Sequence, residues 1–311
     1  MARSAPIASV SQERAGRGQR NATTWWDSKA RWLFPAPAVI AVVLLVVFPL
    51  AYTGYMSFHD WSGSANAAPR FVGLDNFRRI FFADTRSQGA ILRTFAFCAA
   101  AIVVQTVLGI SLALLLNRDY PGKSIVRTIA LLPMVTTPVV IALTWTLIFN
   151  PTQGALLYFA AQFHLPQILW LSDPRAVIPA LVMVDTWEWT PLIMLITLAG
   201  LASLPTEPLE AARIDGASAW QTFWRITLPL LRPAVAVAVL FRGIDAIKTF
   251  DIIFALTNGG PGNASETLNI YTFLTAFSYQ KIGYASSLLV VFFVLVLALS
   301  LLLSRLRRSS I

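Results

Sequence analysis

The chain has 311 residues, of which 56% are hydrophobic and only 13% are charged, and its mean hydropathy is +0.65. Soluble domains typically carry about a quarter charged residues, so this composition excludes an ordinary soluble enzyme and indicates a membrane protein. The net charge of +9 comes largely from basic clusters that flank apolar segments, which is typical of cytoplasmic ends of membrane spans and argues against a nucleic-acid partner.

The first 32 residues are predicted to form a basic cytoplasmic tail. Residues 1–30 are rich in Ala, Ser, Arg, Gly and Gln and have no apolar period, so we expect this stretch to be disordered. Trp25, Trp26 and Trp32 stand just before the first apolar run, where indoles favour the membrane interface. That run lacks an A-x-A-type cleavage site, so we expect a retained span and not a cleaved signal.

Six apolar segments are long enough to cross the hydrocarbon core, which takes about 20 helical residues. They lie at about 33–57, 91–116, 128–149, 177–201, 234–257 and 285–304. The predicted fold is therefore all-α: a polytopic membrane protein with six transmembrane helices in one domain at 33–304, followed by a basic cytoplasmic tail at 305–311. Prolines inside the spans are tolerable because neighbouring helices can satisfy the freed carbonyls.

The distribution of Lys and Arg predicts the orientation. Both termini and the loops at 117–127 and 202–233 are expected in the cytoplasm, because these four regions contain 15 of the 24 Lys and Arg. The loops at 58–90, 150–176 and 258–284 are then outside, although the first of them also carries four arginines.

The predicted inner loop at 202–233 is too regular for a plain connector. Residues 210–214 are helix formers, Asp215-Gly216 supplies a break where Gly can adopt a positive φ, and residues 219–228 are again helical. Pro229 and Pro233 are expected to end this second helix before the fifth span. Two short helices with exposed apolar and small residues suggest a surface that docks on a partner.

The same loop contains a family motif. Glu210-Ala211-Ala212, Gly216 and Ile226-x-Leu228-Pro229 match the EAA motif, E-A-A-x3-G-x9-I-x-L-P, at every spaced position. The chain thus resembles the permease subunits of binding-protein-dependent ABC importers, over most of its length from about residue 33. FVGLDNF, RTIALLP, IFNPTQGALL and LTNGGPGNASET are similar to the carbohydrate branch, which includes maltose and glycerol-3-phosphate permeases. The maltose-type subunit has extra N-terminal spans and a large external domain, so we expect the shorter six-span version here.

The resemblance implies a type I importer permease fold and a heteromeric complex in the bacterial inner membrane. Its partners would be a second homologous permease, two cytoplasmic ATPase subunits, an external substrate-binding protein and membrane lipid. In that family the loop forms a coupling helix that inserts into a cleft of the ATPase. By position, Glu210 would contact a basic residue of the ATPase, Ala211 and Ala212 would allow close approach, and Gly216 would make the turn. The residues assigned to coupling are Glu210, Ala211, Ala212, Asp215, Gly216 and Ala217.

Catalytic and cofactor motifs are missing from the sequence. PGKS at 121–124 partly matches a phosphate-binding loop, but Asn117 stands where the first Gly is required and no strand precedes it. We therefore expect no enzyme activity, metal or cofactor in this chain, with ATP and Mg bound on the partner ATPase. A secondary transporter and a membrane enzyme are the alternatives; the first would not need the EAA loop, and the second would need a catalytic constellation.

Charges in the predicted fifth span mark a candidate pathway. Arg242, Asp245, Lys248 and Asp251 recur every third residue, which on one continuous helix gives a slanted stripe whose neighbours can pair. Facing lipid, each charge would cost about 2.5–3.5 kcal/mol near the bilayer centre, so we expect them to face the protein interior. Two interpretations stay open: a structural ion-pair ladder, or a translocation pathway that includes Arg242, Asp245 and Thr249.

The resemblance favours the pathway, because the fifth span and the residues just before the EAA loop bind sugar in the maltose-type subunit. Glu188 and Trp189, within DTWEWT, occupy roughly that second region. Sugar sites combine aromatic faces with hydrogen-bonding groups. The expected substrate is a sugar, a polyol or a sugar derivative. The candidate pathway residues are Glu188, Trp189, Arg242, Asp245, Lys248 and Thr249.

Overall fold

The computed structural model describes residues 30, 32–63 and 68–309, so most of the predicted N-terminal tail lies outside the described residues. The chain divides into two units, Met1–Tyr55 and Met56–Ile311, which are described separately. Within the described residues, five helices are long and apolar enough to cross a membrane, or six if one bent pair counts as a single span. The all-α prediction is confirmed.

The first apolar helix runs over Ala36–Met56 with a mean hydropathy of 2.3, as expected from the segment at 33–57. It consists of α2 (Ala36–Val42), a π-helical turn η1 (Val43–Val47) and α3 (Phe48–Met56). Its apolar side chains, such as Leu45 and Phe48, are exposed by 76% and 64%. Such a surface is stable only where lipid or protein covers it.

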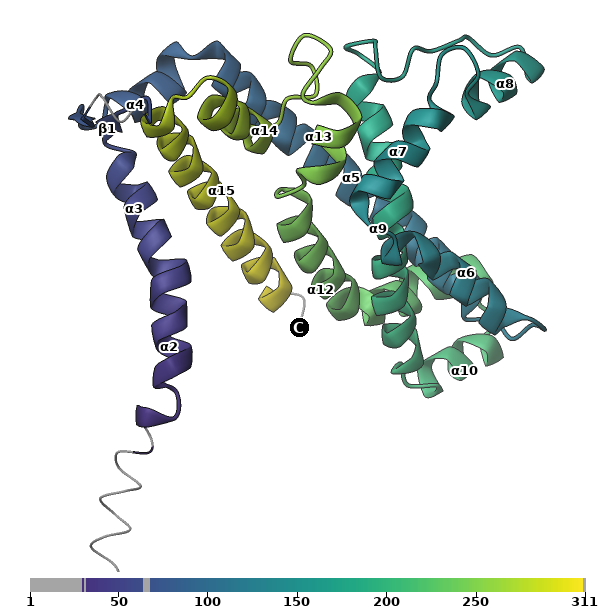
Figure 1. Cartoon of the computed structure of the whole chain (residues 1–311). Coiled ribbons are helices and arrows are strands. Elements are labelled where there is room, and N and C mark those ends of the chain that lie inside the picture. Colours follow the sequence, from purple (N-terminus) through teal and green to yellow (C-terminus); the bar gives the residue numbers. More distant parts are fainter. Residues whose placement is uncertain (1–29, 31, 64–67, 310–311) are drawn as a thin grey trace, which may run out of the picture. The chain divides into compact units, whose positions relative to one another are not determined.

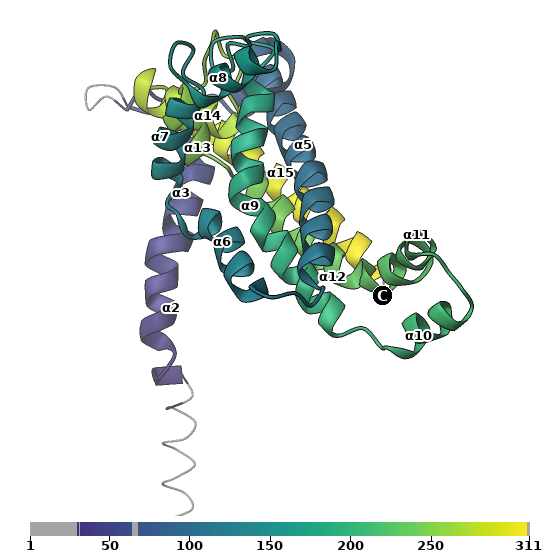
Figure 2. The same ribbon diagram turned by 90° about the vertical axis from the view of Figure 1, so that its right-hand side faces the viewer.

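The second unit is organised around α9 (Val177–Ala202), the most buried of the long helices. It packs against α5 (Thr85–Leu116), α12 (Leu228–Ala246) and the broken helix formed by α6 (Lys123–Val135) and α7 (Pro138–Ile148). Helix α15 (Ile282–Ser309) lies beside α12 (Figures 1 and 2). Gly109 of α5 permits a close approach to α9: a Cβ there would lie 2.8 Å from Ile193.

The predicted third span at 128–149 is not one straight helix. It consists of α6 (Lys123–Val135) and α7 (Pro138–Ile148), bent by 100° at the intervening pair Thr136-Thr137. Both threonines have extended backbone angles, with ψ of 144° and 141°. The cause is Pro138, because a proline ring disfavours the helical conformation of the residue before it and has no amide to continue the hydrogen-bond ladder.

The prediction for the fifth span at 234–257 is wrong at both ends. One helix runs from Ala219 to Ala246 through α11 (Ala219–Thr222), the π-helical turn η3 (Phe223–Thr227) and α12. Pro229 and Pro233 do not end it: Pro229 lies in the first turn of α12, directly after the change of hydrogen-bond pattern, and Pro233 lies inside α12. A proline there removes one backbone bond and leaves the helix intact.

The loops predicted to share a side of the membrane lie together at one end of the second unit. Asn117 and Arg118 line the same cavity as residues of the segment at 202–233. At the other end, Asp84 accepts hydrogen bonds from Tyr271 and Tyr284. The short elements at that end are β1 (His59–Asp60), β2 (Arg70–Phe71), α4 (Asp75–Arg78), η2 (Arg79–Ala83), α8 (Ala155–Gln162), α13 (Asp251–Thr257), α14 (Leu268–Phe273) and η4 (Leu274–Ser278).

Candidate functional site

The segment that carries the EAA motif forms two short helices joined by a tight turn. The first, α10, runs over Glu207–Ile214 with Glu207 and Glu210 in its first turn, where carboxylates favour the helix dipole. Gly216 follows with φ +71°, a left-handed conformation that suits glycine. Ser218 and Gln221 then form a capping box that starts α11. The predicted break at Asp215-Gly216 is confirmed.

The outer face of this segment is apolar and uncovered. Ile214 and Trp220 are exposed by 86% and 71%, and Trp224 by 50%. The two indoles meet edge to face, with ring centroids 5.5 Å apart. Glu210 is exposed as well, while Ala212 is only 5% exposed and faces its own chain. We name the exposed face, consisting of Glu210, Ile214 and Trp220, the coupling surface.

A cavity of about 880 Å³ lies between this segment and the ends of α5 and α9. Its walls include Arg118, Arg213 and Trp220, so the Trp220 ring borders the cavity as well as the solvent. Since α10 packs mainly on η3, it has room to shift relative to α5.

The polar residues of the long helices meet in a buried cluster. Arg242 of α12 is fully buried and forms an ion pair with Asp185 of α9. Its Nε donates to Gln105 Oε1 of α5 at 2.7 Å, and Gln105 Nε2 donates in turn to Asp185 Oδ2 at 2.7 Å. Because each buried charge needs partners in a low dielectric, this cluster fixes three helices together. We name Gln105, Asp185 and Arg242 the buried cluster.

Only part of the predicted charge stripe exists. Arg242 and Asp245 pair at 3.3 Å, as the i,i+3 spacing predicts. The helix ends at Ala246, however, so Lys248 lies in the following turn and Asp251 begins α13. A continuous four-residue ladder is therefore wrong, and the main partner of Arg242 comes from another helix.

A small polar pocket opens beside the buried cluster. Its volume is about 160 Å³, and its lining combines aromatic and ionisable side chains. Four of the predicted pathway residues, in addition to Asp245, line it: Glu188, Trp189, Lys248 and Thr249. Glu188 is 1% exposed and its Oε2 has no hydrogen-bond partner among the described residues. The Trp189 ring lies under the Arg242 guanidinium, 5.3 Å from ring centroid to Cζ.

The structure thus brings five predicted residues together around one pocket and leaves Arg242 behind them, outside its lining. Gln105 was missed by the sequence analysis, although a lone amide within the apolar run AAAIVVQTVLG was a usable signal. An amide in the middle of a span is costly unless it is paired, so it marks a contact with another helix.

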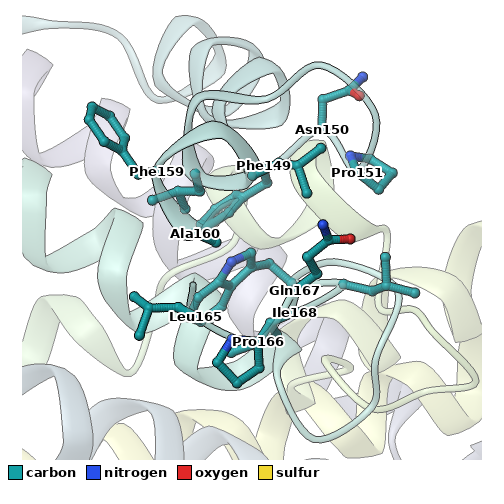
Figure 3. A pocket seen from close by; sticks show the side chains of 13 residues that line it. Phe149, Asn150, Pro151, Phe159, Ala160, Leu165, Pro166, Gln167 and Ile168 are labelled. Atoms are coloured by element: carbon teal, nitrogen blue, oxygen red, sulfur yellow. The ribbon is translucent and has the colours of Figure 1, made fainter. Parts of the chain in front are cut away.

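An apolar pocket of about 320 Å³ lies at the end opposite the coupling surface, between α8 and the loop that follows it (Figure 3). The Phe149 ring contacts Trp170 at its base, with centroids 5.9 Å apart. Asn150 and Gln167 supply the polar groups of its lining. The pocket offers apolar contact and no ionisable group, unlike the pocket beside Glu188.

Comparison with known proteins agrees with this arrangement. Residues 105–309 match the family described as binding-protein-dependent transport system inner membrane component. The chain belongs to this family. It is 34% identical over 278 residues to the trehalose/maltose transport system permease protein MalF of Thermococcus litoralis, which covers 88% of this chain and 92% of that protein. It is 31% identical to the sulfoquinovosyl glycerol transport system permease protein SmoG of Agrobacterium fabrum, over 92% of this chain and 94% of that protein.

Among solved structures, one permease-containing neighbour is a bacterial ABC transporter for the import of the acidic polysaccharide alginate. The TM-score is 0.78 at 23% identity, and the match covers 92% of this chain and 99% of that chain. The MetNI methionine ABC transporter matches with a TM-score of 0.54 over 71% of this chain and 94% of that chain. These matches establish the importer permease fold for this inner membrane component, a multi-pass membrane protein.

Proposed function

We propose that this inner membrane component forms half of the path for an uncharged sugar or polyol in an ATP-driven importer. The observation that carries the proposal is the pocket beside Glu188, which combines an aromatic face with carboxylates and a hydroxyl. Sugar hydroxyls donate to carboxylates while the apolar face of the ring packs on an aromatic side chain. Relatives named for trehalose/maltose and for multiple sugars support a carbohydrate.

Charge argues for an uncharged substrate. Three carboxylates, Glu188, Asp245 and Asp251, line the pocket against one cation, Lys248. Arg242 adds no free positive charge because Asp185 and Gln105 already hold its guanidinium. An acidic sugar would therefore meet repulsion from Asp245 and Asp251, whereas a neutral one can hydrogen-bond to Glu188 Oε2.

ATP would be bound and hydrolysed, with Mg, on separate cytoplasmic subunits. The coupling surface supports this, because its exposed Ile214 and Trp220 at the EAA positions offer apolar contact to a partner. A second, homologous permease would complete the path, and an external binding protein would deliver the sugar. Both termini and α10 would face the cytoplasm.

The test is uptake by the complete complex in proteoliposomes, with its own binding protein. Neutral di- and oligosaccharides should be transported in an ATP-dependent manner, and Glu188→Gln should raise KM for them. A complex that transports only acidic sugars, or that leaves KM unchanged in Glu188→Gln, would refute the assignment of this pocket.

Orientation has its own test. In a Cys98→Ala background, cysteines at Ser203 and Asn263 should react with membrane-impermeant maleimide from opposite faces, with Asn263 accessible from outside. Both positions are exposed in the structure. Labelling of Ser203→Cys from outside would reverse the orientation.

A further inference from the structure

A second polar pocket lies at the end of the bundle opposite the coupling surface, where α5 and α15 begin. Its volume is about 220 Å³, and its lining consists of three cations, three tyrosines and Thr275. The cations are Arg79, Arg86 and Lys281. No carboxylate lines it, in contrast to the pocket beside Glu188.

The two carboxylates next to this pocket are already occupied. Glu266 accepts two hydrogen bonds from Arg86, at 2.8 and 2.5 Å. Asp84 accepts from the phenols of Tyr271 and Tyr284, at 2.6 and 2.7 Å, and from two backbone amides at the start of α5. Burial alone would raise the pKa of Asp84, but these donors outweigh it and lower the pKa, so the carboxylate stays ionised and engaged.

Two of the three cations keep their charge uncompensated by a carboxylate. Arg79 and Lys281 are exposed and make no ion pair with any residue that the structure describes, although the Arg79 guanidinium lies over the Tyr284 ring, 5.0 Å from Cζ to the centroid. Thr275 is only 1% exposed, and its hydroxyl has no hydrogen-bond partner within the described part of the chain. A buried hydroxyl without a partner is destabilising, so an acceptor that enters the pocket gains a hydrogen bond to Thr275.

We propose that this pocket binds the phosphate of an anionic membrane phospholipid. Guanidinium, ammonium and hydroxyl donors are the groups that bind phosphate in proteins. The pocket sits at the first turns of two membrane-spanning helices, at the level where tyrosines and lipid headgroups meet.

Exposed apolar side chains in the same turn as Arg79 favour a lipid over a soluble anion. Phe81 and Phe82, which lie in η2 with Arg79, are exposed by 48% and 82%. Acyl chains need such apolar surface near the charged site, whereas a free ion does not.

The experiment counts lipids retained by the full complex in nanodiscs of phosphatidylcholine with increasing phosphatidylglycerol, by native mass spectrometry. Arg79→Gln/Lys281→Gln should weaken phosphatidylglycerol retention about 25-fold, since each surface cation contributes about a fivefold factor. The matched control Arg70→Gln/Arg175→Gln removes two exposed cations at the same end, outside the pocket, and should retain lipid as the wild type does.

Thr275→Val keeps the shape of the side chain and removes only the hydroxyl, so it should weaken retention by a smaller factor. Two further titrations use discs without phosphatidylglycerol: one adds inorganic phosphate, and the other adds the external binding protein. They show whether a free anion or the binding protein, instead of a lipid, occupies the pocket. Equal retention by the wild type and the Arg79/Lys281 variant would overturn the proposal. It would also be overturned if the variant lost only phosphate affinity or only binding-protein affinity.

Discussion

The coupling surface and the buried cluster are constructed in opposite ways. In the cluster, Arg242 has no exposed surface and three protein partners. On the coupling surface, Ile214 and Trp220 are largely exposed, and Trp220 also borders a cavity. A charge inside a membrane protein must be satisfied within the chain, while a surface that binds a partner keeps its apolar groups uncovered.

The largest effect on stability is expected from breaking the buried cluster. Arg242→Gln leaves Asp185 buried without a counter-ion, which should destabilise the protein by about 3–5 kcal/mol. Thermal unfolding of the purified complex measures this. Arg242→Gln/Asp185→Asn leaves no buried charge unpaired, since Asp245 is 46% exposed, and should recover most of the loss. If the single variant unfolds like the wild type, the cluster does not stabilise the helix packing.

Asp245→Asn tests which carboxylate contributes most to the stability of the buried cluster. Asp245 is 46% exposed and lies 3.3 Å from Arg242, so its ion pair is screened and its loss should cost far less than that of Asp185. The melting temperature should fall further in Asp185→Asn than in Asp245→Asn if Asp185 is the main partner of Arg242. Equal shifts would contradict the geometry.

The coupling surface should show the reverse behaviour. Ile214→Asp/Trp220→Asp should reduce ATPase co-purification at least about tenfold, as expected for buried anchor residues of an interface, while thermal stability changes little. The matched control Tyr158→Asp/Phe163→Asp alters two similarly exposed apolar residues at the opposite end. Normal ATPase binding by Ile214→Asp/Trp220→Asp would show that the coupling surface does not bind the ATPase.

Substrate contact is expected to have an intermediate effect. Trp189→Ala should raise KM about fivefold, since one aromatic face of the pocket is lost. Trp187 is a control two residues away on the same helix: it stacks edge to face on Trp145 and does not line the pocket. Trp187→Ala should change KM less than twofold, and equal effects would argue that both tryptophans act only through packing.

The smallest effect concerns Asp84, the N-cap of α5. Asp84→Ala should cost about 1 kcal/mol of stability, because the side-chain cap of α5 is lost. The folded pKa is lowered, so the stabilisation is present above the unfolded pKa near 3.9 and is lost as pH falls through the folded value. Thermal scans between pH 3 and pH 7 should show this acid-sensitive component in the wild type and not in the variant.

Local features were predictable from the sequence, and contacts between helices were not. Hydropathy located the spans at 177–201 and 285–304 within a few residues, and the EAA spacing located the turn at Gly216. The bend at Thr136-Thr137 was missed because Pro138 was treated as tolerable inside a span, although it also restricts the residue before it.

The candidate pathway was predicted only in part for the same reason. Glu188 and Trp189 were found by composition, but the partner of Arg242 was sought at i,i+3 on its own helix. Its actual partners, Asp185 and Gln105, are 57 and 137 residues away in sequence. Tertiary pairing of this kind leaves no periodic signal in a single sequence.

The unbroken helix from Ala219 to Ala246 has a mechanical consequence. Trp220, on the coupling surface, and Arg242, in the buried cluster, lie on the same rod, separated by 22 residues or about 33 Å of axial rise. A tilt of about 10° at one end would displace the other by about 6 Å over that length. A displacement of that size is larger than the donor–acceptor distance of any hydrogen bond. Tilting this helix would therefore exchange the hydrogen-bond partners of Arg242 without unwinding a single turn.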